Sequence, residues 1–257
     1  MTFSQLHQQA EPLLLANVWD AASARAAETA GYAAIGTSSA AIADSLGYAD
    51  GEGGGFDELK ALVARVRSVS SLPLTVDVEA GYGATSEAVV ANLRELAALG
   101  VVGVNLEDSV VRGSQRTLVD VEPFARRLRD IRAGLQAACV DLFINVRTDT
   151  CLLNVDRARE ETIARGRRYA ESGADGLFVP GLTDEADIAA IVGGVPLPLN
   201  VMCMPALPSF GRLAALGVKR ISMGNFLHQR AHHVLQQLFS DVRAEQSFDP
   251  VFCHAGH

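Results

Sequence analysis

Short apolar runs alternate with longer amphipathic segments along the whole chain. The runs are rich in Val, Ile and Leu, as buried parallel strands are, and the segments between them repeat apolar residues at helical spacing. After a polar start that forms a short helix, eight strand and helix pairs follow. The predicted strands are 13–20, 33–39, 72–79, 103–108, 141–149, 176–183, 196–203 and 220–224, and the predicted helices are 22–31, 56–70, 85–100, 121–138, 155–173, 184–194, 209–217 and 226–242.

Eight consecutive units predict an α/β fold, a (β/α)8 TIM barrel. A parallel sheet has to be covered by helices, and eight strands are the number that closes such a sheet. An open doubly wound sheet is the alternative, but it normally carries GxGxxG after its first strand, and NVWDAAS lacks that turn. With 257 residues, of which 49% are hydrophobic, the chain can bury one sizeable core, so we expect a single domain over 1–257.

Charge and composition exclude several classes of function. The net charge of -8 and a pI near 5.2 argue against a nucleic-acid partner, which needs a basic face. No apolar stretch is long enough to span a membrane, and the first residues resemble no signal peptide, so we expect a cytoplasmic protein. The four cysteines stand far apart without metal-ligand spacing and are interpreted as reduced thiols.

The stretch TVDVEAGYG (75–83) carries the main candidate chemistry. Asp77 and Glu79 alternate with valines, so on a strand both would share one face, and buried carboxylates are costly unless something neutralises them. Glu107 ends the next predicted strand. Carboxylates that converge from neighbouring strand ends suit Mg²⁺, which is held by a few carboxylates and several waters. Helix capping is the competing interpretation for any one of these acids.

Barrel enzymes place their chemistry at the C-terminal ends of the strands. Those ends carry Asn17, Trp19, Asp20, Thr37, Ser38, Ser39, Asp77, Glu79, Tyr82, Glu107, Asp108, Asn145, Arg147, Asp149, Asn200 and Cys203. Arg147 is interpreted as a ligand for a substrate carboxylate, whereas Asp149 and Asp20 are expected to cap or anchor helices. The connections 40–55 and 109–120 are the longest, and we expect one of them to close over substrate.

These motifs resemble the isocitrate lyase and phosphoenolpyruvate mutase superfamily. The similarity runs through NVWDAASA, TSSAAIADSLGYADG, DVEAGYG, VNLED, NVRTD and PLNV, and so covers nearly the whole chain. DVEAGYG resembles the D-x-D/E-x-GYG metal motif of that family, and Arg147 matches its arginine on strand five.

The resemblance implies a Mg²⁺ (or Mn²⁺) site in which Asp77 binds the ion and Glu79, Glu107 and Asp50 assist directly or through waters. It also places Ser38 in a small-residue turn that donates hydrogen bonds to an α-keto carboxylate. Catalytic roles are assigned to Asp50, Arg147 and Tyr82, and substrate binding is assigned to Thr37, Ser38, Ser39, Arg147 and Asn200. Family members break or form a bond next to an α-keto acid through a Mg²⁺-bound pyruvate enolate, which the metal stabilises as a Lewis acid.

The loop 109–120 departs from the family pattern. The lyases of the family carry a loop resembling KKCGH there, with cysteine as the acid, whereas SVVRGSQRTLVD holds neither Cys nor His. Isocitrate or methylisocitrate lyase activity is therefore not expected. The phosphonate enzymes use Lys and Asn or Thr in this loop and a histidine after strand six, where this chain has Pro180-Gly181.

The favoured function is a Mg-dependent lyase or decarboxylase that acts on a small, oxaloacetate-like 2-keto acid. A carbon-phosphorus hydrolase or mutase is the alternative within enzymes, and a non-catalytic keto-acid-binding barrel is the alternative of another class. The resemblance also implies that the last helix is exchanged between subunits in a homo-oligomer, a dimer of dimers. The apolar tail with Phe248, Val251 and Phe252 is consistent with such a buried contact.

Overall fold

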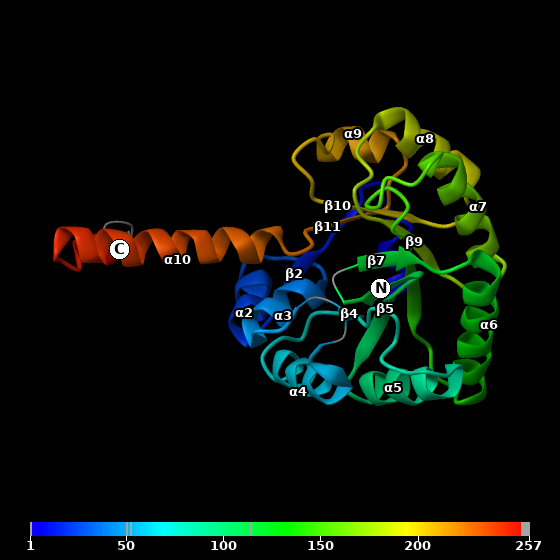
Figure 1. The fold of residues 1–257 in the computed structure, drawn as a ribbon, viewed down its shortest axis with the longest axis horizontal. Helices are drawn as coiled ribbons and strands as arrows, with labels where there is room; N and C mark the ends of the chain where they lie inside the picture. The colour runs from blue at the N-terminus through cyan, green and yellow to red at the C-terminus, as the bar shows by residue number, and fades with distance from the viewer. Residues whose placement is uncertain (1, 50, 52, 114, 253–257) are drawn as a thin grey trace.

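The computed structural model describes residues 2–49, 51, 53–113 and 115–252. Its main sheet consists of nine parallel strands in the order β1-β11-β10-β9-β8-β5-β4-β3-β2 (Figure 1). The strands are β1 Leu13–Leu14, β2 Ala16–Val18, β3 Ile35–Thr37, β4 Leu74–Asp77, β5 Val101–Glu107, β8 Phe143–Arg147, β9 Gly176–Val179, β10 Leu199–Met202 and β11 Arg220–Ser222.

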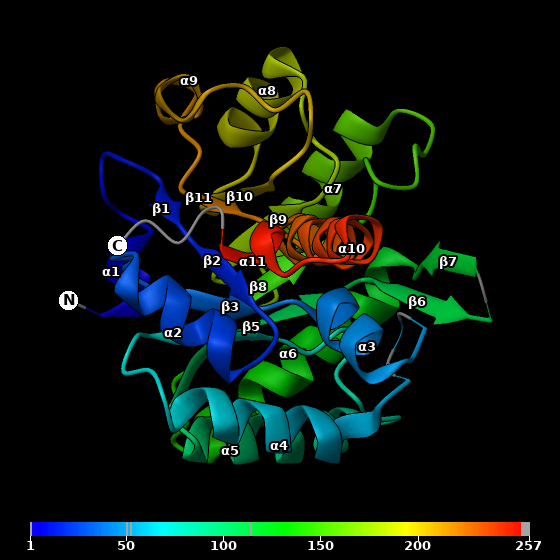
Figure 2. The same cartoon turned by 90° about the vertical axis from the view of Figure 1, so that its left-hand side faces the viewer.

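The two ends of this strand order belong to one stretch of chain. β1 pairs with β11, and β2, which begins after Leu15, pairs with β3. The first predicted strand therefore bridges the last strand and the second, and closes the sheet into a barrel (Figure 2). The predicted (β/α)8 barrel is confirmed.

Helices follow the strands and cover the outside of the barrel (Figure 1). They are α2 Ala21–Thr29, α4 Gly55–Arg67, α5 Ser86–Ala98, α6 Val121–Ala137, α7 Ala158–Ala170, α8 Glu185–Gly194 and α9 Phe210–Ala215. The long helix α10 Phe226–Glu245 follows β11. Short helices α1 Phe3–Leu6 and α11 Asp249–Phe252 lie near the chain ends. None of the helices in the described residues is long and apolar enough to cross a membrane.

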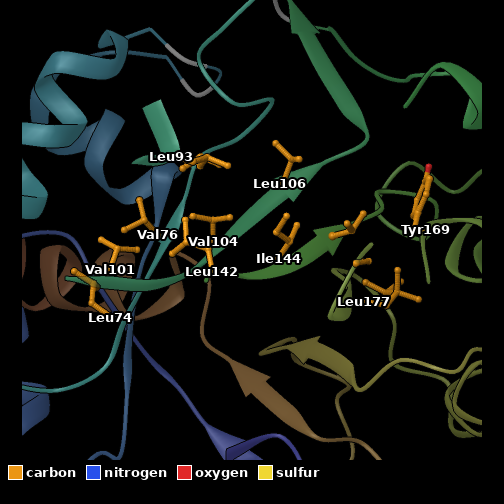
Figure 3. Close-up of a cluster of buried hydrophobic side chains, with 14 of the residues drawn as sticks. Leu74, Val76, Leu93, Val101, Val104, Leu106, Leu142, Ile144, Tyr169 and Leu177 are labelled. Atoms are coloured by element: carbon orange, nitrogen blue, oxygen red, sulfur yellow. The ribbon is translucent and has the colours of Figure 1, made fainter. Parts of the chain in front are cut away.

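Strand alternation separates an apolar outer layer from a polar interior. Val104 and Ile144 are fully buried and pack against the helices, where Figure 3 shows them with Val76, Leu93 and Leu177. The residues next to them in sequence point the other way, into the barrel, because successive side chains alternate across a strand. That alternation brings polar side chains from several strands to the barrel axis.

Both long connections contain secondary structure, and one predicted strand is shorter than expected. The connection 40–55 contains a helix, α3 Ser39–Leu46, which Ser38 caps and Gly47 ends at a φ of 79° that favours glycine. The connection 109–120 forms an antiparallel hairpin of β6 Ser109–Arg112 and β7 Gln115–Leu118. The strand predicted for 72–79 ends at Asp77.

An aromatic cluster closes the N-terminal end of the barrel. The His7 ring stacks on Phe143 with 4.3 Å between ring centroids, and its Nδ1 lies 3.0 Å from the Phe3 carbonyl oxygen. Within the described residues, its Nε2 has no hydrogen-bond partner. Burial lowers the pKa of His7 to about 4, and the nearby charge of Arg220 acts in the same direction.

This buried imidazole predicts a pH-dependent stability. Between pH 6.5 and about 4 the unfolded chain binds a proton that folded His7 does not, so the free energy of unfolding should fall as the pH falls through this window. The full effect is about 3 kcal/mol. Urea unfolding of His7→Leu between pH 7 and 4 should show a flatter acid limb than wild type, and parallel curves would contradict the assignment.

Helix α10 extends away from the barrel (Figure 1). Of its residues, His228 is the buried one, against Trp19 and Ser45, whereas Leu227, Val234, Leu235 and Phe239 are exposed. Phe248, Val251 and Phe252 extend the apolar surface. Large exposed apolar patches usually mark interaction surfaces.

We expect this surface to be covered by other copies of the chain in a homo-oligomer. Light scattering at micromolar concentration should give a mass of at least two 27.2 kDa chains, and the expected dimer of dimers would give four. The double variant Leu235→Glu, Phe239→Glu should lower the mass. Gln236→Glu with Ser240→Glu puts two carboxylates at the same spacing about 100° further around α10 and should leave the mass unchanged. A monomeric wild type would contradict the prediction.

Candidate active site

A cavity of about 260 Å³ opens at the C-terminal ends of the barrel strands. This is where barrel enzymes bind their substrates. Five predicted site residues line it together: Thr37, Ser38, Ser39, Asp77 and Arg147. Asp50 lies outside the described residues, so its predicted role stays a prediction.

Asp77 is the acid at the centre of this lining. Its side chain is buried, and its Oδ2 accepts a hydrogen bond of 2.8 Å from the Ser39 hydroxyl. Its backbone N–H donates to Thr37 Oγ1 at 2.8 Å, so β3 and β4 hold the carboxylate in place. Among the ion pairs of the described residues, none involves Asp77.

The N-terminus of α3 faces the same cavity. The Ser38 hydroxyl accepts from the Ala41 N–H at 3.4 Å, and the Ser38 N–H is already bonded to the Val18 carbonyl. Ser39 and Ala40 begin the helix and also line the cavity. Their N–H groups have no intrahelical acceptor, and such groups at a helix N-terminus bind carboxylates.

Glu79 and Tyr82 lie beside this cavity, not in its lining. Glu79 follows the end of β4 with a φ of 48°, so the prediction that it shares a strand face with Asp77 was wrong. The glycine turn that begins here rotates its side chain toward Tyr82, whose hydroxyl donates to Glu79 Oε1 at 3.0 Å. Both residues line a smaller cleft beneath the connection from α3 to α4.

Two carboxylates and two arginines form an ion cluster next to the cavity. Arg147 Nε lies 2.7 Å from Asp149 Oδ1, and Arg147 Nη1 lies 3.1 Å from Glu107 Oε2. Arg116, on hairpin strand β7, reaches Glu107 Oε1 and lies 3.2 Å from Asp149 Oδ2. The hairpin is thus fastened to the barrel mouth. Asp149, which was predicted to cap or anchor a helix, belongs to this cluster instead.

Glu107 is therefore an ion-pair partner within this cluster. Burial raises the pKa of Glu107 to about 7, and Arg147 and Arg116 oppose that shift. Removing either guanidinium should make the carboxyl harder to ionise, because its desolvation would be less compensated.

Other acids and amides at the strand ends turn away from the cavity. The Asp108 carboxylate points to α7 and accepts from Tyr169, Thr148 and Arg165. Asn200, predicted to bind substrate, uses both ends of its amide inside the barrel: its Oδ1 accepts from Asn145 at 3.1 Å and its Nδ2 donates to the Val201 carbonyl at 2.7 Å. Asp20 caps α2, as predicted.

Comparison with known proteins identifies the family of this chain. The family model described as phosphoenolpyruvate phosphomutase matches residues 3–243. The chain belongs to the phosphoenolpyruvate phosphomutase family. An uncharacterized protein from Mycobacterium tuberculosis H37Rv is 33% identical over 88% of this chain and 82% of its own.

Two further relatives carry functional names. An oxaloacetate decarboxylase from Paraburkholderia xenovorans LB400 is 30% identical over 95% of this chain and 81% of its own. The crystal structure of a candidate phosphonomutase from Burkholderia cenocepacia J2315 superposes with a TM-score of 0.87 at 39% identity, over 93% of this chain and 97% of that one. The family thus contains both lyases and mutases.

One buried cation, Arg220, was not predicted from the sequence. Arg220 is 1% exposed, and its Nη2 lies 3.3 Å from Asn105 Oδ1, whereas its Nε and Nη1 have no hydrogen-bond partner among the described residues. Burial lowers the pKa of Arg220 to about 9, and Asp77 opposes that shift. The available signal in the sequence was an arginine at the start of a predicted buried strand.

The side chains at Asp77 fit a divalent ion. In the described part of the chain, no group of three or more His, Cys, Asp or Glu side chains is arranged to hold a metal. Mg²⁺, however, commonly keeps several waters and binds through one or two carboxylates. A buried carboxylate that lines a cavity and, among the described residues, has no ion pair matches that requirement.

Proposed function

We propose that this protein is a Mg²⁺-dependent lyase or decarboxylase that acts on a small 2-keto acid and forms the enolate of pyruvate. The observation that carries the proposal is Asp77, a buried carboxylate without an ion-pair partner among the described residues, in one cavity with Arg147 and the start of α3. When bound at Asp77, Mg²⁺ would supply a Lewis acid for the developing negative charge.

The chain's own groups would bind and orient the substrate. The N–H groups of Ser39 and Ala40 and the guanidinium of Arg147 supply donors for its carboxylate. Asn105 lines the cavity, and its Oδ1 already accepts from Asn145 and Arg220. That network leaves the Asn105 Nδ2 to donate toward the keto oxygen, so Arg220 acts as a positioning residue.

The hairpin would close the site. Arg116 connects it to Glu107 and Asp149, next to the residue that binds the substrate carboxylate. Closing a site in this way excludes water and strengthens the electrostatic interactions within it. The hairpin residues from Ser109 to Arg112 and from Gln115 to Leu118 include neither Cys nor His, so any proton delivered to the enolate comes from another group or from water.

A carbon-phosphorus hydrolase or mutase is the second candidate, favoured by the 39% identity to the candidate phosphonomutase. A product panel separates the candidates. Purified protein with Mg²⁺ is incubated with oxaloacetate, other 2-keto acids and phosphonopyruvate, and pyruvate, CO₂, phosphate and phosphoenolpyruvate are measured against samples without protein.

Each outcome of the panel selects one function. Pyruvate without phosphate from a keto acid supports the lyase. Pyruvate with phosphate from phosphonopyruvate supports a hydrolase, and phosphoenolpyruvate from phosphonopyruvate supports a mutase. No product from any compound, despite saturable oxalate binding, would indicate a non-catalytic keto-acid-binding barrel and contradict the proposal.

A further inference from the structure

The cavity has a polar side and an apolar side. The polar side comes from adjacent strands β2, β3, β4 and β5 and includes Asn17, Thr37, Asp77 and Asn105. The apolar side comes from β9, β10, the segments that follow β8, β9 and β10, and the start of α10. It consists of Leu152, Phe178, Pro180, Met202, Met204 and Phe226. Ser222, Gly224 and Asn225, on and after β11, complete the lining next to β10.

Arg147 lies where the two sides meet. It ends β8, between β5 and β9 in the sheet, and its Cζ is 5.9 Å from the centroid of the Phe178 ring. A substrate carboxylate held by Arg147 and the start of α3 therefore directs the rest of the molecule along the apolar side. The group carried on C3 would contact Phe178, Met202 and their apolar neighbours.

The charges around the cavity disfavour a second anion there. Among the described lining residues, Arg147 is the only cation, and Glu107 and Asp149 already pair with it. A second carboxylate or a phosphonate on the apolar side would lose its hydration without gaining a cation. An alkyl group there gains up to about fourfold in affinity per buried methylene.

We propose that the substrate is a 2-keto acid whose C3 carries an uncharged group that is apolar apart from a hydroxyl on its first carbon. The bond between C3 and that carbon breaks with its electron pair left in the pyruvate enolate, the hydroxyl proton passes to water, and the group leaves as a neutral aldehyde or ketone. This inference rests on the proposed function and narrows its substrate class: oxaloacetate, with a second carboxylate, fits the apolar side poorly. The apolar side thus acts as the specificity determinant, and the polar side binds the part that all 2-keto acids share.

The test compares two ligands of matching shape. Oxaloacetate carries a carboxylate where 4-methyl-2-oxopentanoate carries an isopropyl group. Calorimetry first measures Mg²⁺-dependent binding of oxalate, which needs only the polar side, and each keto acid, freshly dissolved, then competes with oxalate. We expect 4-methyl-2-oxopentanoate to displace oxalate at a concentration at least about tenfold lower, as burial of several methyl and methylene groups implies.

A cation placed on the apolar side should reverse this order. Met204→Lys is expected to favour oxaloacetate, whereas Phe210→Lys, an equivalent change on the exposed surface of α9, should keep the wild-type ratio. If wild type binds oxaloacetate as tightly as the branched keto acid, or more tightly, the inference is overturned whether or not Met204→Lys folds. Absence of Mg²⁺-dependent oxalate binding would instead overturn the proposed function, and this inference with it.

Discussion

Asp77→Asn is expected to abolish the Mg²⁺ response of the protein and to lower kcat/KM by about 10³-fold or more, because a Lewis acid contributes several kcal/mol to charge stabilisation. Asparagine keeps the shape of the side chain and can still accept from the Ser39 hydroxyl. What it removes is the negative charge, which a hard divalent ion requires.

Activity, metal binding and stability should be measured on the same samples of wild type and Asp77→Asn. Calorimetric titration with millimolar Mg²⁺ should show binding to wild type and none to Asp77→Asn. Asp130→Asn, on the exposed surface of α6, removes a carboxylate elsewhere and should behave like wild type. An Asp77→Asn protein that keeps the wild-type Mg²⁺ dependence would show that the metal is held by other residues.

Arg147→Met is expected to lower kcat/KM by roughly 30- to 4000-fold. A guanidinium that binds a carboxylate in a closed, desolvated site contributes about 2 to 5 kcal/mol. Asp77 and Glu107 make the surroundings negative, so an anionic substrate needs both the metal and this cation. Oxalate inhibition should weaken in parallel, whereas Mg²⁺ affinity without ligand should change little or improve.

Arg147→Met should also lower the stability of the protein, because Arg147 belongs to the ion cluster. Without Arg147, Arg116 is the one cation among the described residues that still pairs with the buried carboxylates of Glu107 and Asp149. The free energy of unfolding should therefore fall, by about 3 kcal/mol if neither acid takes up a proton.

Two further variants separate binding from folding. Arg147→Lys keeps the charge and should recover part of both losses, since an ammonium cannot reproduce the planar fork. Arg94→Met, on the exposed face of α5, serves as the control for loss of a surface arginine. Wild-type turnover by Arg147→Met would show that the substrate anion is held elsewhere, with Arg116 on the hairpin as the next candidate.

The barrel was predictable because its signal is repeated eight times along the chain. A single misplaced boundary does not change the number of units, and strand closure follows from that number. The same logic identified Asp77 and Arg147, which end strands that pair with the preceding and following strands of the main sheet.

Side-chain direction at the strand ends was less predictable. Adjacent residues point to opposite faces, so an error of one residue in where the strand ends exchanges inside and outside. Glu107 and Asp108 are neighbours, yet one pairs with Arg147 and the other with Arg165 on α7. Glu79 lies beyond the end of β4, because the glycine turn starts before Gly81, and its side chain therefore does not follow the alternation of the strand.

Contacts between distant segments could not be predicted at all. Arg116 and Asp149 are 33 residues apart, and they meet only because the hairpin folds back over the barrel mouth. Arg220 and Asn105 come from opposite parts of the chain and share the barrel interior. No local pattern encodes either pairing.

Deuterium exchange at the methyl group of pyruvate tests the central claim most directly. A site that stabilises the pyruvate enolate should exchange these protons with solvent, whatever group the natural substrate carries on C3. In D₂O with Mg²⁺, proton NMR of pyruvate with wild-type protein should show the methyl signal disappearing faster than without protein, and a chelator or Asp77→Asn should remove the difference. Exchange by wild type that is no faster than with Asp77→Asn would contradict an enolate-forming, metal-dependent site.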